Sequence, residues 1–394
     1  MKASAGCPPP PPPLGGGHRR RADWHTWPVV DSLDFEAMQA AGIADPRARS
    51  GLLEYLSGLG FTVDDMAEAE RRGRLFGLAG DLLLRSGPQT FSLRTAAESI
   101  GVPVETVEDG WAMLGLTADD VDTPMLSLAD VDSLATWLAM RAQMADDAAD
   151  GYLRVLGSTV ARLAEAASSM IRTSTPRLWL GHTGDELATA QAYREVAEFI
   201  PRLGQMIDAI HRHHLVSTRT FVEGMARGPS AGLVCGIGFA DLSGFTALTQ
   251  ALTPAELSEL LNGFGATVSD VVLANGGRVV KFLGDAVMWV NSDPARLAQA
   301  ALELVDHPRA REEGLQVRAG LGYGELLATG GDYFGNPVNL AARLVAAAAP
   351  GQILAAAEVY ERLSDWPAIV QEPLQLKGFD FPVIAYELGR SASA

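Results

Sequence analysis

The chain has 394 residues, which is too long for one ordinary hydrophobic core and predicts two folded domains. Its 48 acidic residues outnumber its 31 basic ones, so the formal net charge at pH 7 is -17. This charge opposes non-specific attraction to DNA, RNA or an anionic membrane, because such binding relies on Lys and Arg side chains. A phosphate site must therefore be formed by a small group of donors in one place, and no nucleic acid partner is expected.

Cysteine content and hydropathy indicate the compartment. Only Cys7 and Cys235 occur, so no disulfide framework is expected and a reducing cytosol fits. No apolar stretch approaches the roughly 18 residues of a membrane span, and no signal-peptide core follows the arginines at 19–21. We therefore expect a soluble, cytoplasmic protein.

The first half of the chain consists of a tail rich in proline and glycine and a longer segment with helical periodicity. Residues 1–27 contain consecutive prolines at 8–13 and glycines at 15–17, and such a tail cannot bury enough surface to become ordered. Residues 28–203 have helical periodicity throughout, which predicts an all-helical domain.

Residues 92–116 within that domain look like a helix-turn-helix. The second helix would enter a major groove, yet it carries Glu105, Glu108 and Asp109 and no Lys or Arg. A DNA-binding regulator is therefore an alternative that this acidic helix disfavours, and a packing role is the preferred interpretation.

Residues 204–229 are predicted to be a helical linker, and they contain His211, His213 and His214. The cluster is either a solvated polar face or a proton switch, since histidine titrates near neutral pH and could change domain docking. An apolar, lipid-like ligand between the helices is a competing input.

From residue 230 to 390 the pattern changes to short β-rich runs that alternate with helices. Thr253 and Glu256 form a capping-box pattern ahead of one helix, and residues 278–290 form a hairpin pattern around Gly284. The order β, α, β, β, α, β predicts an α+β domain with one antiparallel sheet.

Two aspartates in this region each follow an apolar strand pattern. Asp241 leads into Leu242, Ser243, Gly244, Phe245 and Thr246, a turn whose backbone N–H groups could bind phosphate. Asp285 follows Gly284 in the hairpin. Oxygen ligands on neighbouring strands suit Mg²⁺ or Mn²⁺, so the pair predicts a two-metal centre.

A third motif, residues 332–343, places Asn336 as an expected N-cap ahead of Pro337 and a helix. Asn339 and Arg343 are four residues apart, so both can reach one ligand, and the guanidinium could neutralise charge on a phosphoryl group. Lys281 and Asp332 are a candidate adenine-selecting pair, because Lys donates to a ring nitrogen and Asp accepts from an exocyclic amine.

Together these three motifs, in this order, resemble the catalytic domain of the class III adenylate cyclases over residues 230–390. The resemblance implies a ferredoxin-like domain that converts ATP to 3′,5′-cyclic AMP and pyrophosphate in the cleft of a homodimer. By motif position, Asp241 and Asp285 would hold two metal ions per site, and Lys281 with Asp332 would select adenine.

The same resemblance implies that Asn339 and Arg343 act on the transition state and that Lys377 binds phosphate. The metal carboxylates would come from one chain, and the base-selecting pair, Asn339 and Arg343 would come from the other. The helical half resembles the regulatory half of pH-responsive, autoinhibited bacterial cyclases. A nucleotide-binding sensor with little turnover and a guanylate cyclase are the alternatives within this reading.

Overall fold

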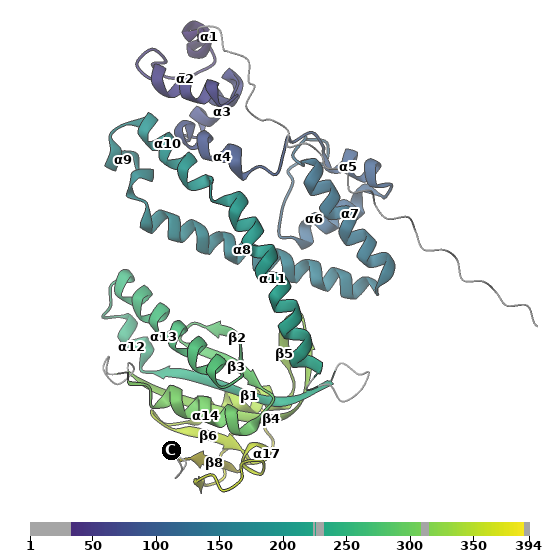
Figure 1. Ribbon diagram of the computed structural model, residues 1–394, viewed down its shortest axis with the longest axis vertical. Helices are drawn as coiled ribbons and strands as arrows, with labels where there is room; N and C mark the ends of the chain where they lie inside the picture. Colours follow the sequence, from purple (N-terminus) through teal and green to yellow (C-terminus); the bar gives the residue numbers. More distant parts are fainter. Residues whose placement is uncertain (1–32, 224, 226–231, 309–314, 390–394) are drawn as a thin grey trace, which may run out of the picture. The chain divides into compact units, whose positions relative to one another are not determined.

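The computed structural model describes residues 33–223, 225, 232–308 and 315–389 (Figure 1). Chain contacts divide it into two compact units. The first takes in the chain up to Glu108 with Ala118–Ala135 and Val160–Gln205, and the second takes in Asp109–Thr117, Thr136–Thr159 and the chain from Met206 onward. The predicted disordered tail, 1–27, lies outside the described residues.

The prediction that the front half is helical is confirmed. Its helices are α1 (Phe35–Ala40), α2 (Ser50–Gly58), α3 (Val63–Arg71), α4 (Leu78–Leu84), α5 (Leu93–Ile100), α6 (Val104–Met113), α7 (Leu128–Gln143), α8 (Asp146–Ser174), α9 (Leu180–Thr183), α10 (Glu186–Ala197) and α11 (Ile200–Glu223). In the described part of the chain, no helix combines the length and the apolar character that a membrane span requires.

An ion-pair cluster connects α10 to the first helices. Arg49 contacts Glu70 through Nη1 at 2.6 Å, and it contacts both carboxylate oxygens of Glu186 at 2.6 and 2.9 Å. Beside it, buried residues of the first three helices pack into one core with Ala190 of α10. A two-pronged guanidinium–carboxylate contact fixes orientation as well as distance, so α10 is held against helices far away in sequence.

Residues 92–116 contain two helices joined by a short turn, α5 and α6, as predicted. α5 begins with a capping box between Ser92 and Thr95, and it ends at Gly101, which has the left-handed φ of 86° that glycine tolerates. Arg94 at the start of α5 pairs with Asp122 at 2.6 Å, so this cation already has an internal partner.

The described residues of the second unit form one sheet. Its strands are β1 (Gly232–Ser243), β2 (Arg278–Leu283), β3 (Ala286–Asn291), β4 (Gln316–Thr329), β5 (Asp332–Phe334), β6 (Ile353–Ala356), β7 (Ala368–Val370) and β8 (Ala385–Leu388). The helices that alternate with these strands are α12 (Phe245–Thr249), α13 (Pro254–Ala274), α14 (Pro294–Val305), α16 (Asn336–Ala347) and α17 (Ala357–Tyr360). The strand order is β2-β3-β1-β4-β6-β8-β7, with β5 paired to β4.

The prediction of a purely antiparallel sheet is wrong, because β4 and β6 pair in parallel through Ala319 and Ile353. The chain between them includes α16, and a strand that returns through a crossover helix runs parallel to the first strand. The sheet is therefore mixed. The hairpin of β2 and β3 and the Thr253 capping box are as predicted.

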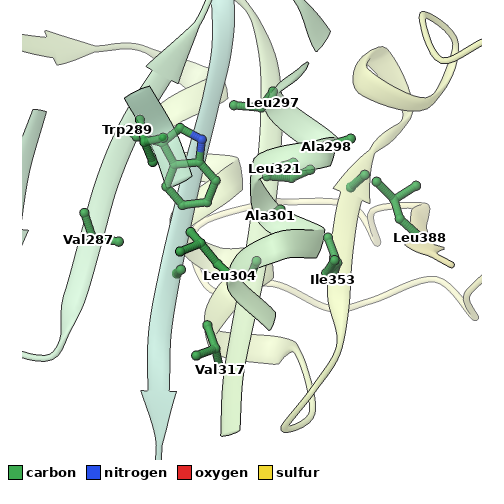
Figure 2. Packing of buried hydrophobic residues seen from close by; sticks show 14 of the residues in the cluster. Val287, Trp289, Leu297, Ala298, Ala301, Leu304, Val317, Leu321, Ile353 and Leu388 are labelled. Atoms are coloured by element: carbon green, nitrogen blue, oxygen red, sulfur yellow. The ribbon is translucent and has the colours of Figure 1, made fainter. Parts of the chain in front are cut away.

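Side chains alternate between the two faces of the sheet, and each face has its own core. Figure 2 shows the core on the face that α14 covers, with Trp289 and Val287 of β3 packed beside Leu297 and Leu304 of α14. The intervening Met288 lies in a separate cluster with residues of β1 and α16. Trp289, at 0% exposure, is the largest fully buried side chain.

Glycines in β4 allow α16 to lie close to the sheet. A Cβ atom at Gly320 would lie 2.3 Å from the backbone nitrogen of Val345, and one at Gly322 would lie 2.4 Å from the carbonyl oxygen of Pro337. Both distances are shorter than real Cβ contacts. Side chains at these two positions would push α16 outward, so the glycines determine where the residues of α16 lie.

Candidate active site

The two metal-site candidates lie next to each other in the structure. Asp241, near the end of β1, pairs in register with Ala286 of β3, and Asp285 directly precedes Ala286 in the turn with Gly284. Gly284 has a φ of 69°, which glycine adopts readily. The carboxylates interact: burial raises the pKa of the Asp285 carboxyl, and the nearby Asp241 carboxylate raises the pKa further.

Arg318 is the cation beside these two carboxylates, and its place in the site was not predicted from the sequence. Arg318 of β4 is the other register partner of Asp241, and its Nε and Nη2 donate to Asp241 Oδ2 at 3.0 and 2.6 Å. Its Nη1 donates to the carbonyl oxygens of Ala346 and Ala348 at the end of α16, at 3.4 and 3.3 Å. The available signal was a single charged residue inside the otherwise apolar strand 317–321.

The carboxylate pair has part of the ligand set that a hard divalent cation needs. Among the residues that the structure describes, no group of three or more His, Cys, Asp or Glu side chains is arranged to bind a metal. Mg²⁺ commonly takes one or two carboxylates and completes its shell with water and substrate phosphates. The mutual repulsion of Asp241 and Asp285 is what such a cation would relieve, so the residues fit a metal that arrives with a nucleotide.

The segment after Asp241 leads from the end of β1 into a short helix. Leu242 is buried in the core, and the Oγ atom of Ser243 is buried without a hydrogen-bond partner among the described residues. Gly244, with a φ of 81°, is the N-cap of the short helix α12 that begins at Phe245. The side chain of Thr246 lies outside the described residues.

The candidate base-selecting residues are brought together. Lys281 of β2 forms an ion pair with Asp332 of β5, and the Asp332 carboxylate also accepts from the Tyr333 N–H at 2.8 Å. The two side chains are 34% and 25% exposed, so a ligand can reach both. The register between β2 and β3 shifts between Val279 and Lys281, and a bulge of this kind re-aims the following side chain.

Asn339 and Arg343 lie one turn apart on the exposed side of α16, as predicted. Neither side chain forms a hydrogen bond with any residue that the structure describes, so both side chains are available to a ligand. The predicted N-cap is wrong: Gly335 is the N-cap of α16, and Asn336 is the first helical residue. Gly335 has a φ of 142°, and a Cβ there would lie 3.2 Å from the carbonyl oxygen of Glu325, which favours glycine at this point.

Two sets of candidates are not joined to these pairs. Lys377 is exposed in the turn after the buried Leu376, and within the described ranges it contacts none of the other site residues through a hydrogen bond or ion pair. The three histidines, His211, His213 and His214, are exposed on α11, near an ion pair between Asp208 and Arg212.

Family models match both halves of the chain. Residues 232–388 match the adenylate and guanylate cyclase catalytic domain, and residues 34–218 match the adenylate cyclase regulatory domain. An uncharacterized protein from Mycobacterium bovis is 64% identical over 91% of this chain and 95% of its own length.

Relatives with a named activity are more distant. An adenylate cyclase from Streptomyces coelicolor is 34% identical over 69% of this chain and 72% of its own length. A pH-sensitive adenylate cyclase from Mycobacterium tuberculosis is 30% identical over 88% of this chain and 89% of its own length. The solved adenylyl cyclase CyaB from P. aeruginosa is 26% identical, covers 41% of this chain and 96% of its own, and has a TM-score of 0.39. The chain belongs to the class III adenylate and guanylate cyclase family, and it combines that family's catalytic domain with an adenylate cyclase regulatory domain.

Proposed function

We propose that the protein converts ATP to 3′,5′-cyclic AMP and pyrophosphate, with Mg²⁺ or Mn²⁺, in a homodimer. The Lys281–Asp332 pair carries the choice of substrate. An ammonium donor beside a carboxylate acceptor matches the adenine edge, which offers a ring-nitrogen acceptor and an amine donor. The guanine edge has the opposite order, so both protein groups would be left without partners.

Each group of residues has a separate part in the reaction. Bound Mg²⁺ or Mn²⁺, held by Asp241 and Asp285, would lower the pKa of the ribose 3′-hydroxyl and neutralise phosphate charge. Asn339 and Arg343 hold the ribose and the α-phosphate so that the 3′-oxygen lies in line with the leaving group. The 3′-hydroxyl gives up its proton to solvent water, the 3′-oxygen bonds to the α-phosphorus, and the bond from that phosphorus to pyrophosphate breaks. No covalent intermediate with the protein is needed. Lys377 and the N–H groups of residues 243–246 stabilise the pyrophosphate charge.

The homodimer is part of the proposal because the site residues form separate groups. No hydrogen bond or ion pair within the described ranges joins the Asp241–Asp285 pair to Lys281–Asp332, Asn339 or Arg343. A second copy that supplies the missing half would complete two sites per dimer.

Mixed dimers test the function and the subunit arrangement together. Asp241→Asn and Arg343→Ala should each abolish cyclic AMP formation by removing a different half of the site. Mixing the two inactive variants should restore part of the activity, because a mixed dimer contains one intact site. Continued inactivity in a mixture shown to contain mixed dimers would contradict sites shared between chains.

We also propose that the helical half regulates catalysis and that proton binding at His211, His213 and His214 is one input. Support comes from the regulatory-domain match and from the exposure of all three histidines on α11. Replacing the three by Gln should flatten the pH profile of the full chain between pH 5.5 and 8. An unchanged profile would eliminate these histidines as the sensor and would favour an apolar ligand as the input.

A further inference from the structure

One hydroxyl group in the candidate site is buried without a partner. The Oγ atom of Ser243 forms no hydrogen bond with any residue that the structure describes, and no other hydroxyl among those residues is buried in this condition. The hydroxyl of Ser269, for comparison, donates to the carbonyl oxygen of Gly265 at 2.8 Å. A buried polar group without a partner has lost the hydrogen bonds that water gave it, so the Ser243 hydroxyl destabilises the folded chain unless something else satisfies it.

Ser243 lies close to the carboxylate pair and faces the same side of the sheet. Asp241 and Ser243 are two residues apart on β1, so their side chains share a face and their Cα atoms are roughly 7 Å apart. In the neighbouring strand, Arg318 is the register partner of Asp241, and Gln316 is the register partner of Ser243. Register partners also share a face. The hydroxyl, the Asp241 carboxylate and the Arg318 guanidinium therefore lie on one side of the sheet at the end of β1.

The backbone beyond Ser243 leaves room for a ligand. Gly244 is exposed, and a Cβ atom at that position would have no heavy atom of the described residues within 4 Å, apart from its chain neighbours. Ser243 as a whole is only partly buried. Because a serine side chain turns between staggered positions about a single bond, its Oγ atom can move towards this space while the backbone stays in place.

The surroundings of the hydroxyl favour a phosphate oxygen as its partner. A serine hydroxyl can donate one hydrogen bond, and anionic oxygens are the strongest acceptors that it meets. Asp241 and Asp285 offer oxygen ligands to a divalent cation, and Mg²⁺ in such sites is shared with substrate phosphates. The backbone N–H groups of residues 243–246 are proposed above to bind the pyrophosphate end of the nucleotide, and the Ser243 side chain belongs to the same segment.

We propose that the Ser243 hydroxyl donates a hydrogen bond to a phosphate oxygen at the pyrophosphate end of the nucleotide, in addition to the backbone N–H groups of this segment. The hydroxyl keeps its proton, and no bond of the side chain forms or breaks. This inference rests on the proposed function, since it adds a substrate-binding side chain to that same site. Ser243 then lowers the stability of the free protein and raises its affinity for the nucleotide.

Ser243→Ala in the full chain tests the contact, because alanine has no hydroxyl to leave unpaired and none to donate. Without nucleotide or metal, the thermal unfolding midpoint should rise by roughly 2 °C or more. The value of kcat/KM for ATP should fall about 10- to 100-fold, which is the usual effect of losing a hydrogen bond to a charged group. The inhibition constant of pyrophosphate should rise by a similar factor. Ser243→Thr retains a hydroxyl and should lose less of kcat/KM than Ser243→Ala.

Ser269→Ala is the matched control, since it removes a hydroxyl on α13 that already has a backbone partner. It should leave kcat/KM for ATP at the wild-type value. In Ser243→Ala, the affinity for Mn²⁺ without nucleotide, measured by the electron paramagnetic resonance of free Mn²⁺, should match that of the wild type, because the hydroxyl binds phosphate and not the metal.

Unchanged ATP kinetics or a lower unfolding midpoint in Ser243→Ala would overturn the inference, and so would a loss of Mn²⁺ affinity or an equal loss of kcat/KM in Ser243→Thr. If the wild type made no cyclic nucleotide, the proposed function would fail. Calorimetric titration of pyrophosphate with Mg²⁺ into the wild type and into Ser243→Ala would still decide the inference: weaker binding by the variant would support it, and equal binding would contradict it.

Discussion

Substituting Gly322 by Ala should displace the helix that carries Asn339 and Arg343. The added Cβ would lie 2.4 Å from the carbonyl oxygen of Pro337, and ordinary contact begins at 3.4 Å, so the first turn of α16 must move by 3.4 − 2.4 = 1.0 Å. The obstructing atom is backbone, so no side-chain rotation can relieve the contact. Overpacking of this kind costs about 1–3 kcal/mol in the free energy of unfolding.

The substitution should lower kcat strongly while the protein remains folded. A displacement of 1 Å at positioned groups lowers kcat by about a hundredfold, whereas the stability loss lowers the unfolding midpoint by roughly 2–12 °C. Initial rates of cyclic AMP formation at saturating ATP, with thermal unfolding of the same preparation, give both quantities.

Gly265→Ala in α13 is the control for this substitution. Its Cβ would meet only the Phe282 ring at 3.8 Å, which is ordinary contact, so alanine should be tolerated and should add up to about 1 kcal/mol of helix stability. A Gly322→Ala protein that is destabilised but keeps the wild-type kcat would refute the argument that close packing of α16 positions the catalytic pair. Wild-type stability would refute the close approach itself.

Three further predictions concern the carboxylate pair and the cores. In EDTA, Asp285→Asn should raise the thermal unfolding midpoint at pH 7. The pKa of Asp285 is raised in the folded state, so the folded wild type favours the protonated carboxyl. The wild-type protein is therefore most stable, with respect to this group, below pH about 3.9, and it loses that stability as the pH rises through the folded pKa. The gain should shrink towards pH 4, and a pH-independent difference would contradict it. Burial raises the pKa of Cys235 to about 12, so in a Cys7→Ser variant a thiol reagent at pH 8 should label Cys235 only after denaturant is added; rapid native labelling would show that the thiol is accessible. Gly238→Ala should destabilise the catalytic domain by about 1–3 kcal/mol, since its Cβ would lie 2.2 Å from the Trp289 ring, and an unchanged denaturant midpoint would count against that packing.

Local features of the fold could be read from the sequence because their partners are close in the chain. The capping box of α13 joins Thr253 to Glu256, and the turn before Asp285 needs a glycine whose φ is positive. These features depend on hydrogen bonds and backbone angles within a few residues, so residue types at a fixed spacing are sufficient to indicate them.

Most residues of the candidate site were also proposed from the sequence. Asp241 and Asp285 were expected to be neighbours because each follows a strand of the same sheet, and their register through Ala286 is consistent with this expectation. The pairing of Lys281 with Asp332 follows from a resemblance between motifs, and the structure brings the two side chains into contact.

The remaining features of the fold and the site depend on how strands that are far apart in the sequence pair with each other. Arg318 contacts Asp241 across 77 residues of sequence because β1 pairs with β4 along the whole of β1. A shift of one residue in this register would have turned the guanidinium to the other face. The parallel pairing of β6 with β4 and the packing of Phe221 of α11 against residues of β1 and α16 have the same origin. Such contacts depend on how distant strands and helices pack together, and that free energy is a property of the assembled core, which no single segment of the sequence contains.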